Sequence, residues 1–252
     1  MKMRSGFQGV AAIVRFNWPF YVVAGLLVIL LSGGLFFVAP GWAMLVLVFA
    51  LLGGAYFLIV SLLVSHLIYD RSDLYRFGWL GRIPETRNAK RAVFCHSGFD
   101  EASDLLRDAI WNAEWTVLDH YDATRMTEPS IKRARKLFPP TEETVAARYD
   151  DWPAEDDQAD LIFGILAIHE FRSVGERTGW FAEARRSLAP GGRIIVVEHV
   201  RDLANFVAFG PGFFHFHSVE KWRESWEGAG LKLANTFRIT PWVRVFVISE
   251  NE

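Results

Sequence analysis

The chain has 252 residues and a formal net charge of -2, which suits one catalytic domain with a smaller appendage. This near-neutral balance does not indicate the strongly basic face that nucleic-acid-binding proteins usually carry, so no nucleic-acid partner is expected. Cys95 is the single cysteine, which excludes an internal disulfide.

The first third of the sequence is apolar, with no charged residue between Arg15 and Asp70. Residues 20–39 and 42–64 form two apolar runs separated by Pro40 and Gly41. Each run is long enough to cross a bilayer, which takes about 20 helical residues. The pattern predicts a transmembrane helical hairpin over residues 19–66 that binds the lipid bilayer. A signal peptide is the alternative, since a positive start and one apolar run also fit it.

Positive residues flank the outer ends of the two runs, and none lies at the tip between them. The positive-inside rule therefore places both termini, residues 1–18 and the catalytic domain in the cytoplasm, as in a two-span inner-membrane protein. Residues 6–16 form either a short interfacial helix or a frayed tail. Residues 67–90 connect membrane and domain, along the headgroups or at the mouth of a site. The positive flanks are Lys2, Arg4, Arg15, Arg71, Arg76, Arg82, Arg87, Lys90 and Arg91, and the candidate interfacial anchors are Trp18, Tyr21, Trp42, Tyr69, Tyr75 and Trp79.

Strand and helix patterns alternate over residues 91–252. This alternation predicts an α/β domain with a doubly wound, mostly parallel, seven-stranded sheet. The last two strands are antiparallel, because residues 240–242 are too few for a crossover helix. Ligands of such a fold bind at the carboxyl ends of the strands. Strands are expected at 92–95, 115–118, 145–149, 161–168, 193–198, 231–239 and 243–249, and helices at 101–111, 128–138, 176–188 and 219–229, with Asp100 and Ser218 as N-caps.

Residues 160–202 contain a strand, a helix, the turn LAPGG at 188–192 and another strand, and residues 130–136 read SIKRARK. This arrangement resembles the class I S-adenosylmethionine-dependent methyltransferases, type 11-like, in a divergent membrane-anchored branch. The resemblance implies the Rossmann-like methyltransferase fold, with S-adenosylmethionine as cofactor. The family's first loop is rich in glycine and follows an acid, whereas residues 95–101 (CHSGFDE) keep only Gly98 and have no leading acid.

The resemblance also assigns cofactor-binding residues. Asp119 or Asp122, after the second strand, would bind the ribose hydroxyls, and Gly98 would approach the cofactor closely. Asp150 and Asp151 would contact the adenine amino group. The alternatives are capping aspartates, a turn glycine and a solvated acidic loop.

Histidines and glutamates follow two central strands and the segment after them. Because these positions meet at one edge of the sheet, they are the candidate catalytic residues. One histidine would act as a general base for a hydroxyl, phenol or amine. The cluster would alternatively bind a divalent metal, although the spacing matches no compact metal motif, or serve only in packing. The candidates are His169, Glu170, Glu198, His199, His215 and His217.

Residues 201–217 form an aromatic segment that would wall an acceptor pocket, dip into the bilayer or pack on the sheet. We expect methyl transfer to a small apolar acceptor of the lipid, quinone or isoprenoid type, because an anchored enzyme meets such molecules at high local concentration. Two other functions remain open. The sparse glycine loop suits a catalytically degenerate, cofactor-binding membrane scaffold, and the His/Glu cluster suits a metal-dependent enzyme. The aromatic positions are Phe206, Phe209, Phe213, Phe214 and Phe216.

Overall fold

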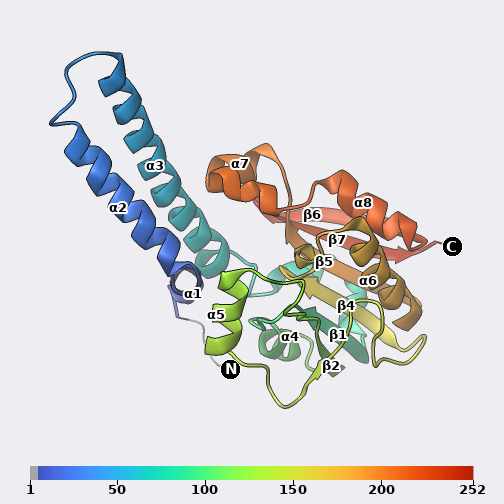
Figure 1. Ribbon diagram of the computed structural model, residues 1–252. Coiled ribbons are helices and arrows are strands. Elements are labelled where there is room, and N and C mark those ends of the chain that lie inside the picture. The colour runs from blue at the N-terminus through green and yellow to red at the C-terminus, as the bar shows by residue number, and fades with distance from the viewer. Residues whose placement is uncertain (1–4, 252) are drawn as a thin grey trace.

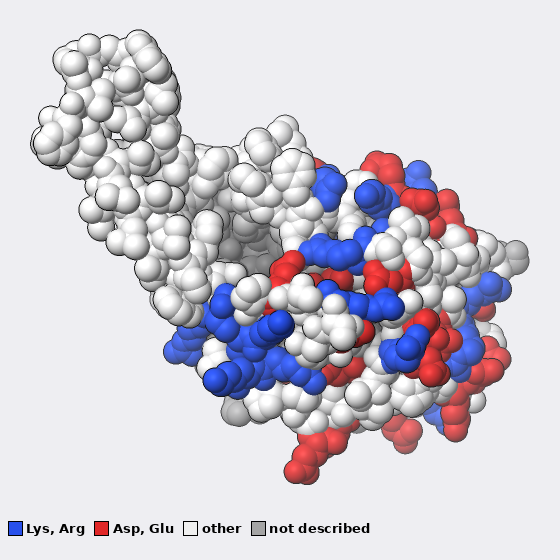
Figure 2. All heavy atoms as spheres, viewed as in Figure 1, with Lys and Arg blue, Asp and Glu red and all other residues white. Residues whose placement is uncertain are grey.

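The computed structural model describes residues 5–251, and it has a helical hairpin that projects from an α/β domain (Figure 1). Lys2 and Arg4, two of the predicted positive flanks, lie outside the described residues. In Figure 2 the projecting hairpin is white, whereas charged side chains cover much of the domain. The two parts of the chain therefore have surfaces suited to different surroundings.

The hairpin consists of α2 (Trp18–Gly34) and α3 (Trp42–His66). Among the described residues, α3 with its continuation to Arg71 is the one helix that by length and composition would cross a membrane. The α1–α2 pair adds a second span only if its two helices, bent by 78°, count as one. The first helix ends at Gly34, earlier than the predicted 39, because Gly33 and Gly34 weaken the helix before the turn.

Residues 8–16 form a helix, α1 (Gln8–Phe16), that lies across the foot of the hairpin. The carboxylate of Asp70 accepts hydrogen bonds from the backbone N–H groups of Gly9 at 2.6 Å and Val10 at 3.1 Å. A negative charge at this end of a helix satisfies otherwise unpaired donors and complements the helix dipole. Asp70 therefore fastens α1 to the hairpin foot.

The connector forms a π-helical turn, η1 (Leu67–Arg71), and two 3₁₀ turns, η2 (Gly78–Arg82) and η3 (Pro84–Arg87). Its apolar side chains Ile68, Leu74 and Trp79 are buried in the domain core, in one cluster with Leu161 and Phe163. The prediction that Trp79 anchors at a membrane interface is wrong, since only 4% of its surface is exposed.

The predicted seven-stranded sheet is present, in the order β3-β2-β1-β4-β5-β7-β6. The sheet is mixed: β7 runs antiparallel to β5 and to β6, and the other neighbours are parallel. The strands are β1 (Arg91–His96), β2 (Glu114–Asp119), β3 (Thr144–Ala146), β4 (Ala159–Ile165), β5 (Leu188–His199), β6 (Leu231–Thr240) and β7 (Val243–Glu250).

The turn predicted at residues 188–192 is instead the beginning of β5. Leu188 pairs with Ala159 on β4, and the register shifts between Ala159 and Leu161. Gly191 has a φ of +81°, a conformation that favours glycine. The sequence LAPGG therefore belongs to the first, bent part of β5, and β5 follows directly on the helix that ends at Ser187.

Helices cover the sheet on both faces. One face packs against α6 and α8 through Trp180, Trp222 and Trp226, and the other packs against α4 and the connector. An additional helix, α7, lies beside α3 and was not predicted (Figure 1). The helices are α4 (Ser103–Ala109), α5 (Pro129–Leu137), α6 (Val174–Ser187), α7 (Leu203–Phe209) and α8 (Val219–Gly228), with 3₁₀ turns η4 (Ile168–Glu170) and η5 (Gly210–His215).

Candidate active site

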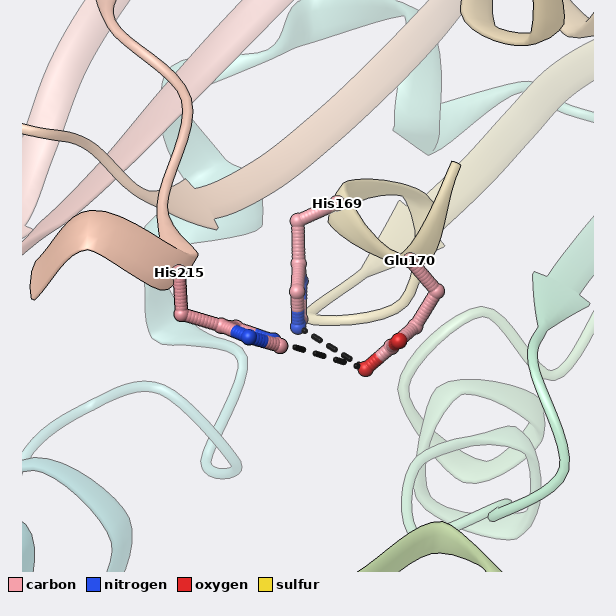
Figure 3. A group of neighbouring side chains, drawn as sticks. All are labelled: His169, Glu170 and His215. Carbon is pink, nitrogen blue, oxygen red and sulfur yellow. Dashed lines mark ion pairs between the residues drawn. The ribbon is translucent and has the colours of Figure 1, made fainter. Parts of the chain in front are cut away.

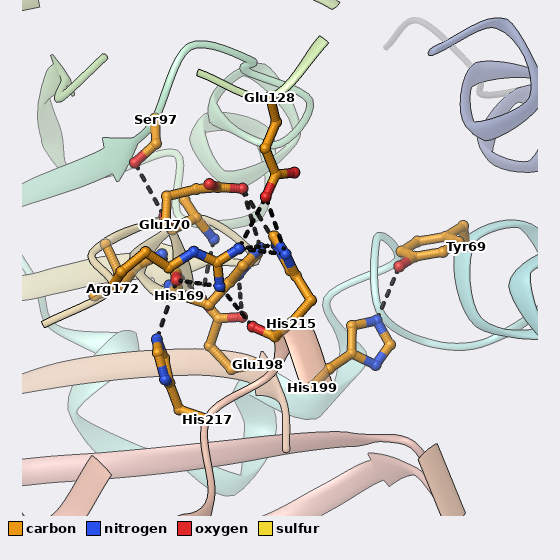
Figure 4. Close-up of polar contacts among 12 residues, drawn as sticks. Tyr69, Ser97, Glu128, His169, Glu170, Arg172, Glu198, His199, His215 and His217 are labelled. Atoms are coloured by element: carbon orange, nitrogen blue, oxygen red, sulfur yellow. Dashed lines mark hydrogen bonds and ion pairs between the residues drawn. The ribbon is translucent and has the colours of Figure 1, made fainter. Parts of the chain in front are cut away.

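Four of the six predicted catalytic residues meet at the carboxyl edge of the sheet. His169 and Glu170 lie on η4 after β4, Glu198 is near the end of β5, and His215 ends η5 (Figure 4). The strand order places β4 and β5 side by side, so their ends share one edge. This is where an open α/β sheet binds its ligands.

Glu198 organises the loop after β4. It is fully buried, and its Oε1 accepts backbone hydrogen bonds from Ala167, Ile168 and His169 at 3.0, 2.9 and 3.2 Å. Its Oε2 lies 2.7 Å from Nδ1 of His169. Burial lowers the pKa of His169, but the charges of Glu198 and Glu170 outweigh burial and raise that pKa to about 10. His169 is therefore held as an imidazolium between two carboxylates at neutral pH.

The carboxylate of Glu170 faces two histidines, as Figure 3 shows. Its Oε1 is 3.4 Å from Nε2 of His169 and 3.7 Å from Nε2 of His215. Burial raises the pKa of Glu170, but hydrogen bonds with both histidines hold that pKa well below its usual range. Burial lowers the pKa of His215, and hydrogen bonds with Glu128 and Glu170 raise it to above its ordinary value. Carboxylates therefore pair with imidazoles throughout this group, which we call the proton network.

Two members of this network were not predicted. Glu128, the N-cap residue of α5, lies 3.2 Å from Nδ1 of His215 and 3.0 Å from Nη2 of Arg172. Arg172 also donates to the carbonyl oxygen of His215 at 2.7 Å. The available signal was Pro129, because proline favours the first turn of a helix and so places Glu128 at the helix start. No local pattern indicated which charges Arg172 would meet.

The structure places His199 and His217 apart from this network. Nε2 of His199 lies 2.8 Å from the hydroxyl of Tyr69, and its Nδ1 faces the carbonyl of Trp242 at 3.1 Å. Nε2 of His217 lies 3.1 Å from both Nη1 of Arg177 and the carbonyl of His169. Burial lowers the pKa of His199 to about 4 and that of His217 to about 3, so both are neutral at pH 7.

Asp119 and Asp122 both line a cavity of about 360 Å³, within the range of small-molecule sites. Oδ1 of Asp119 accepts hydrogen bonds from the backbone N–H groups of Gly98 at 2.8 Å and Tyr121 at 3.0 Å, while its Oδ2 pairs with Arg135. Asp122 is half-buried and accepts from Thr124. A ribose would therefore share Asp119 with Arg135 or bind Asp122.

Gly98 borders a second cavity of about 560 Å³, between the loop after β1 and α1. It has a φ of +89°, and an added Cβ would come within 2.8 Å of the Tyr121 ring. The neighbouring Phe99 packs against Phe16 and Phe138 at ring distances of 5.1 and 5.3 Å. The Gly98–Asp119 hydrogen bond thus joins a loop of one cavity to an acid of the other.

Asp150 and Asp151 lie outside the lining of both cavities. Asp150 makes two hydrogen bonds of 3.0 Å with the guanidinium of Arg148. The nearby residues that do line the first cavity are Arg148 and Tyr149. An adenine group in this cavity would therefore contact Tyr149, and not the side chains of the two predicted acids.

The comparisons with known proteins agree with this topology. Residues 111–196 match the methyltransferase domain family. No curated protein matches the chain. Among solved structures, the S-adenosylmethionine-dependent methyltransferase from Clostridium acetobutylicum has a TM-score of 0.51 at 8% identity, covering 71% of this chain and 92% of its own. The PH0226 protein from Pyrococcus horikoshii has a TM-score of 0.52 at 14% identity, covering 71% and 89%.

The structural likenesses establish the fold, and the family match covers its central part, from just after α4 through most of β5. The rest of the sheet, including β1 and the antiparallel β7 beside β5, lies outside the family match. Residues 91–252 therefore have the fold of S-adenosylmethionine-dependent methyltransferases, and their central part matches the methyltransferase domain family.

Proposed function

We propose that the protein transfers a methyl group from S-adenosylmethionine to an apolar acceptor that resides in the membrane, of the lipid, quinone or isoprenoid type. The observation that carries this proposal is that the carboxyl edge of the sheet meets the hairpin foot. The hydroxyl of Tyr69, directly after α3, lies 2.8 Å from Nε2 of His199 at the end of β5. A hairpin in the bilayer would hold this edge at the membrane surface, with both termini in the cytoplasm.

The two cavities fit the two parts of the cofactor. The first has carboxylates for ribose hydroxyls, Asp119 and Asp122, and aromatic rings for adenine, Tyr149 and Phe171. The second combines the guanidinium of Arg15 with acidic side chains after β1, a charge pattern that suits a zwitterionic amino acid. When bound, S-adenosylmethionine supplies an electrophilic methyl group on a positively charged sulfur. The acids of the second cavity are Asp100, Glu101 and Asp104.

The proton network would remove a proton from the acceptor during methyl transfer. Methyl transfer to a hydroxyl or phenol needs a group that removes a proton. His215 is the more exposed histidine of the network, with 26% of its side chain accessible against 11% for His169. We assign the base role to His215 in its neutral form, and the orientation of η4 to Glu198 and His169.

A divalent metal is the alternative use of this network. His169, Glu170 and His215 offer ligand atoms that all lie within 4.8 Å of one another. However, Nη2 of Arg172 lies 3.0 Å from Nε2 of His215, so a metal ion there would face a fixed positive charge. This contact favours the proton network over the metal site.

Cofactor binding is tested by titrating S-adenosylmethionine into the detergent-solubilised protein by calorimetry. We expect Asp122→Asn to bind about tenfold more weakly, because losing one charge-assisted hydrogen bond costs about 1.4 kcal/mol. Asp150→Asn is the matched control, since Asp150 lies outside the cavity, and it should bind as the wild type does. A folded protein that binds no cofactor would instead rule out the proposed methyl transfer.

The acceptor class is tested in vesicles made from native membrane lipids, with S-adenosylmethionine labelled in its methyl group. We expect label to appear in the solvent-extractable lipid fraction, and this transfer to be lost in His215→Gln while cofactor binding stays unchanged. Label that remains only in water-soluble products would rule out the membrane acceptor without affecting the cofactor assignment.

A further inference from the structure

An uncharged segment covers part of the domain beside the hairpin. No charged residue lies between Leu203 and Phe214, the stretch that forms α7 and most of η5. Leu203 and Phe214 expose 75% and 63% of their surfaces, and Phe206 and Val207 expose 41% and 47%. Large apolar side chains gathered on one surface indicate a partner.

The inward side of α7 is fixed to the domain. Asn205, its one polar residue, is fully buried and donates to the carbonyl oxygens of Val200 at 2.9 Å and Trp242 at 3.1 Å. The polar group therefore faces the sheet, whereas Leu203, Phe206 and Val207 expose much of their surfaces. The outward face of α7 is therefore apolar, as a surface that contacts lipid acyl chains has to be.

Another side of α7 contacts the hairpin itself. The hydroxyl of Tyr56, on α3, donates to the carbonyl of Val207 at 3.3 Å. At Gly210 the chain approaches the ring of Phe57 so closely that a Cβ would lie 2.9 Å from it. If Tyr56 and Phe57 of α3 lie in the bilayer, α7 beside them therefore lies in the bilayer too.

The contact lies well along α3 from its foot. Tyr56 precedes His66 by ten residues, which corresponds to about 15 Å along a helix. The foot itself is marked by α1, where the ring of Phe7 stacks on His66 at 4.7 Å. Figure 1 shows α7 beside α3 and nearer the hairpin tip than α1.

We infer that α7 and η5 insert into the cytoplasmic leaflet beside α3, with lipid acyl chains just below the headgroups covering Leu203, Phe206, Val207 and Phe214. This inference rests on the proposed membrane anchoring. η5 ends at His215, so insertion would place the proton network directly at the membrane surface. An acceptor with an apolar tail would then present its polar group to the network while its tail stays in the leaflet.

The test uses the full-length protein in phospholipid vesicles. Cys95, the one cysteine, is completely buried, so a cysteine introduced at the surface can be labelled selectively with an environment-sensitive fluorophore. The variants are Leu203→Cys and Val207→Cys on α7, with Glu224→Cys on the exposed face of α8 as the control. We expect nitroxides attached near the headgroup end of the acyl chains to quench the α7 labels, and aqueous iodide to quench the α8 label.

A fourth variant, Phe49→Cys on α3, separates this inference from the anchoring on which it rests. If acyl-chain nitroxides quench the α3 label while the α7 labels behave like the α8 control, the hairpin is in the bilayer and the inference is wrong. If iodide quenches the α3 label as well, the membrane anchoring itself is wrong.

Discussion

Glu198 holds the loop after β4 in place at the carboxyl edge of the sheet. One fully buried carboxylate accepts three backbone N–H groups of the loop after β4 and the ring of His169. An isolated buried charge would be strongly unfavourable, and these donors compensate its desolvation. The pKa of its partner His169 is raised to about 10, so this imidazole carries its proton at neutral pH. The pair therefore links the conformation of η4 to pH.

We predict that Glu198→Gln destabilises the protein by about 3–5 kcal/mol, because it leaves the buried imidazolium without its main counter-charge. His169 has a raised pKa in the fold, so its contribution is complete below its ordinary value of 6.5 and is lost as pH rises through about 10. The free energy of unfolding of the wild type should fall over this interval, and that of Glu198→Gln should fall much less. Denaturant titrations at several pH values, followed by tryptophan fluorescence, measure both effects.

Glu227→Gln, an exposed substitution on α8, is the control and should leave the pH dependence unchanged. A Glu198→Gln variant with the wild-type slope against pH would show that Glu198 does not set the pKa of His169.

At the scale of elements, the contact between α7 and α3 requires a glycine at the end of α7. Gly210 has a φ of +54° and meets the ring of Phe57. We predict that Gly210→Ala destabilises the protein by about 1–3 kcal/mol, through backbone strain, and loosens α7 from α3. Gly212→Ala is the matched control, since its Cβ would meet only an ordinary contact at 3.8 Å. Thermal unfolding and amide exchange over residues 203–209 test this, and equal behaviour of the two variants would contradict it.

The elements that the sequence predicts well are those with a local signal. Ser218 caps α8 as expected, and the apolar runs of the sequence indicate all seven strands. The elements that it misplaces depend on distant partners. Residues 188–192 read as a turn because of Pro190 and the two glycines, yet pairing of Leu188 with Ala159 makes them part of β5. Similarly, α7 requires α3 and Trp242 beside it, and neither is near in sequence.

The candidate site shows the same division. The sequence places His169, Glu170 and Glu198 at one edge, because each follows or ends a central strand. It does not separate His215, which joins them, from His199, which faces the hairpin foot. That distinction depends on how residues 200–217 fold back, and on Arg172 and Glu128, whose charges meet only in the folded chain.

At the scale of the whole molecule, the connector is part of the domain core. Ile68, Leu74, Phe77 and Trp79 are each at most 5% exposed, and they cover the sheet face opposite α6 and α8. A mixture of aromatic and charged residues suits a membrane surface as well as a core edge, so the sequence alone does not decide between them. Burial of these side chains contributes about 1.5–3 kcal/mol each.

We therefore predict that a chain beginning at residue 67 folds in mild detergent, whereas one beginning at residue 91 does not. The longer chain keeps the connector and the Tyr69–His199 hydrogen bond, but the shorter one exposes the sheet face around Leu161 and Phe163. Near-ultraviolet circular dichroism and gel filtration should show fixed aromatic packing in the longer chain, and aggregation or loss of packing in the shorter. If both chains fold equally well, the connector does not contribute to the stability of the domain core, and the hairpin is only weakly coupled to the carboxyl edge of the sheet.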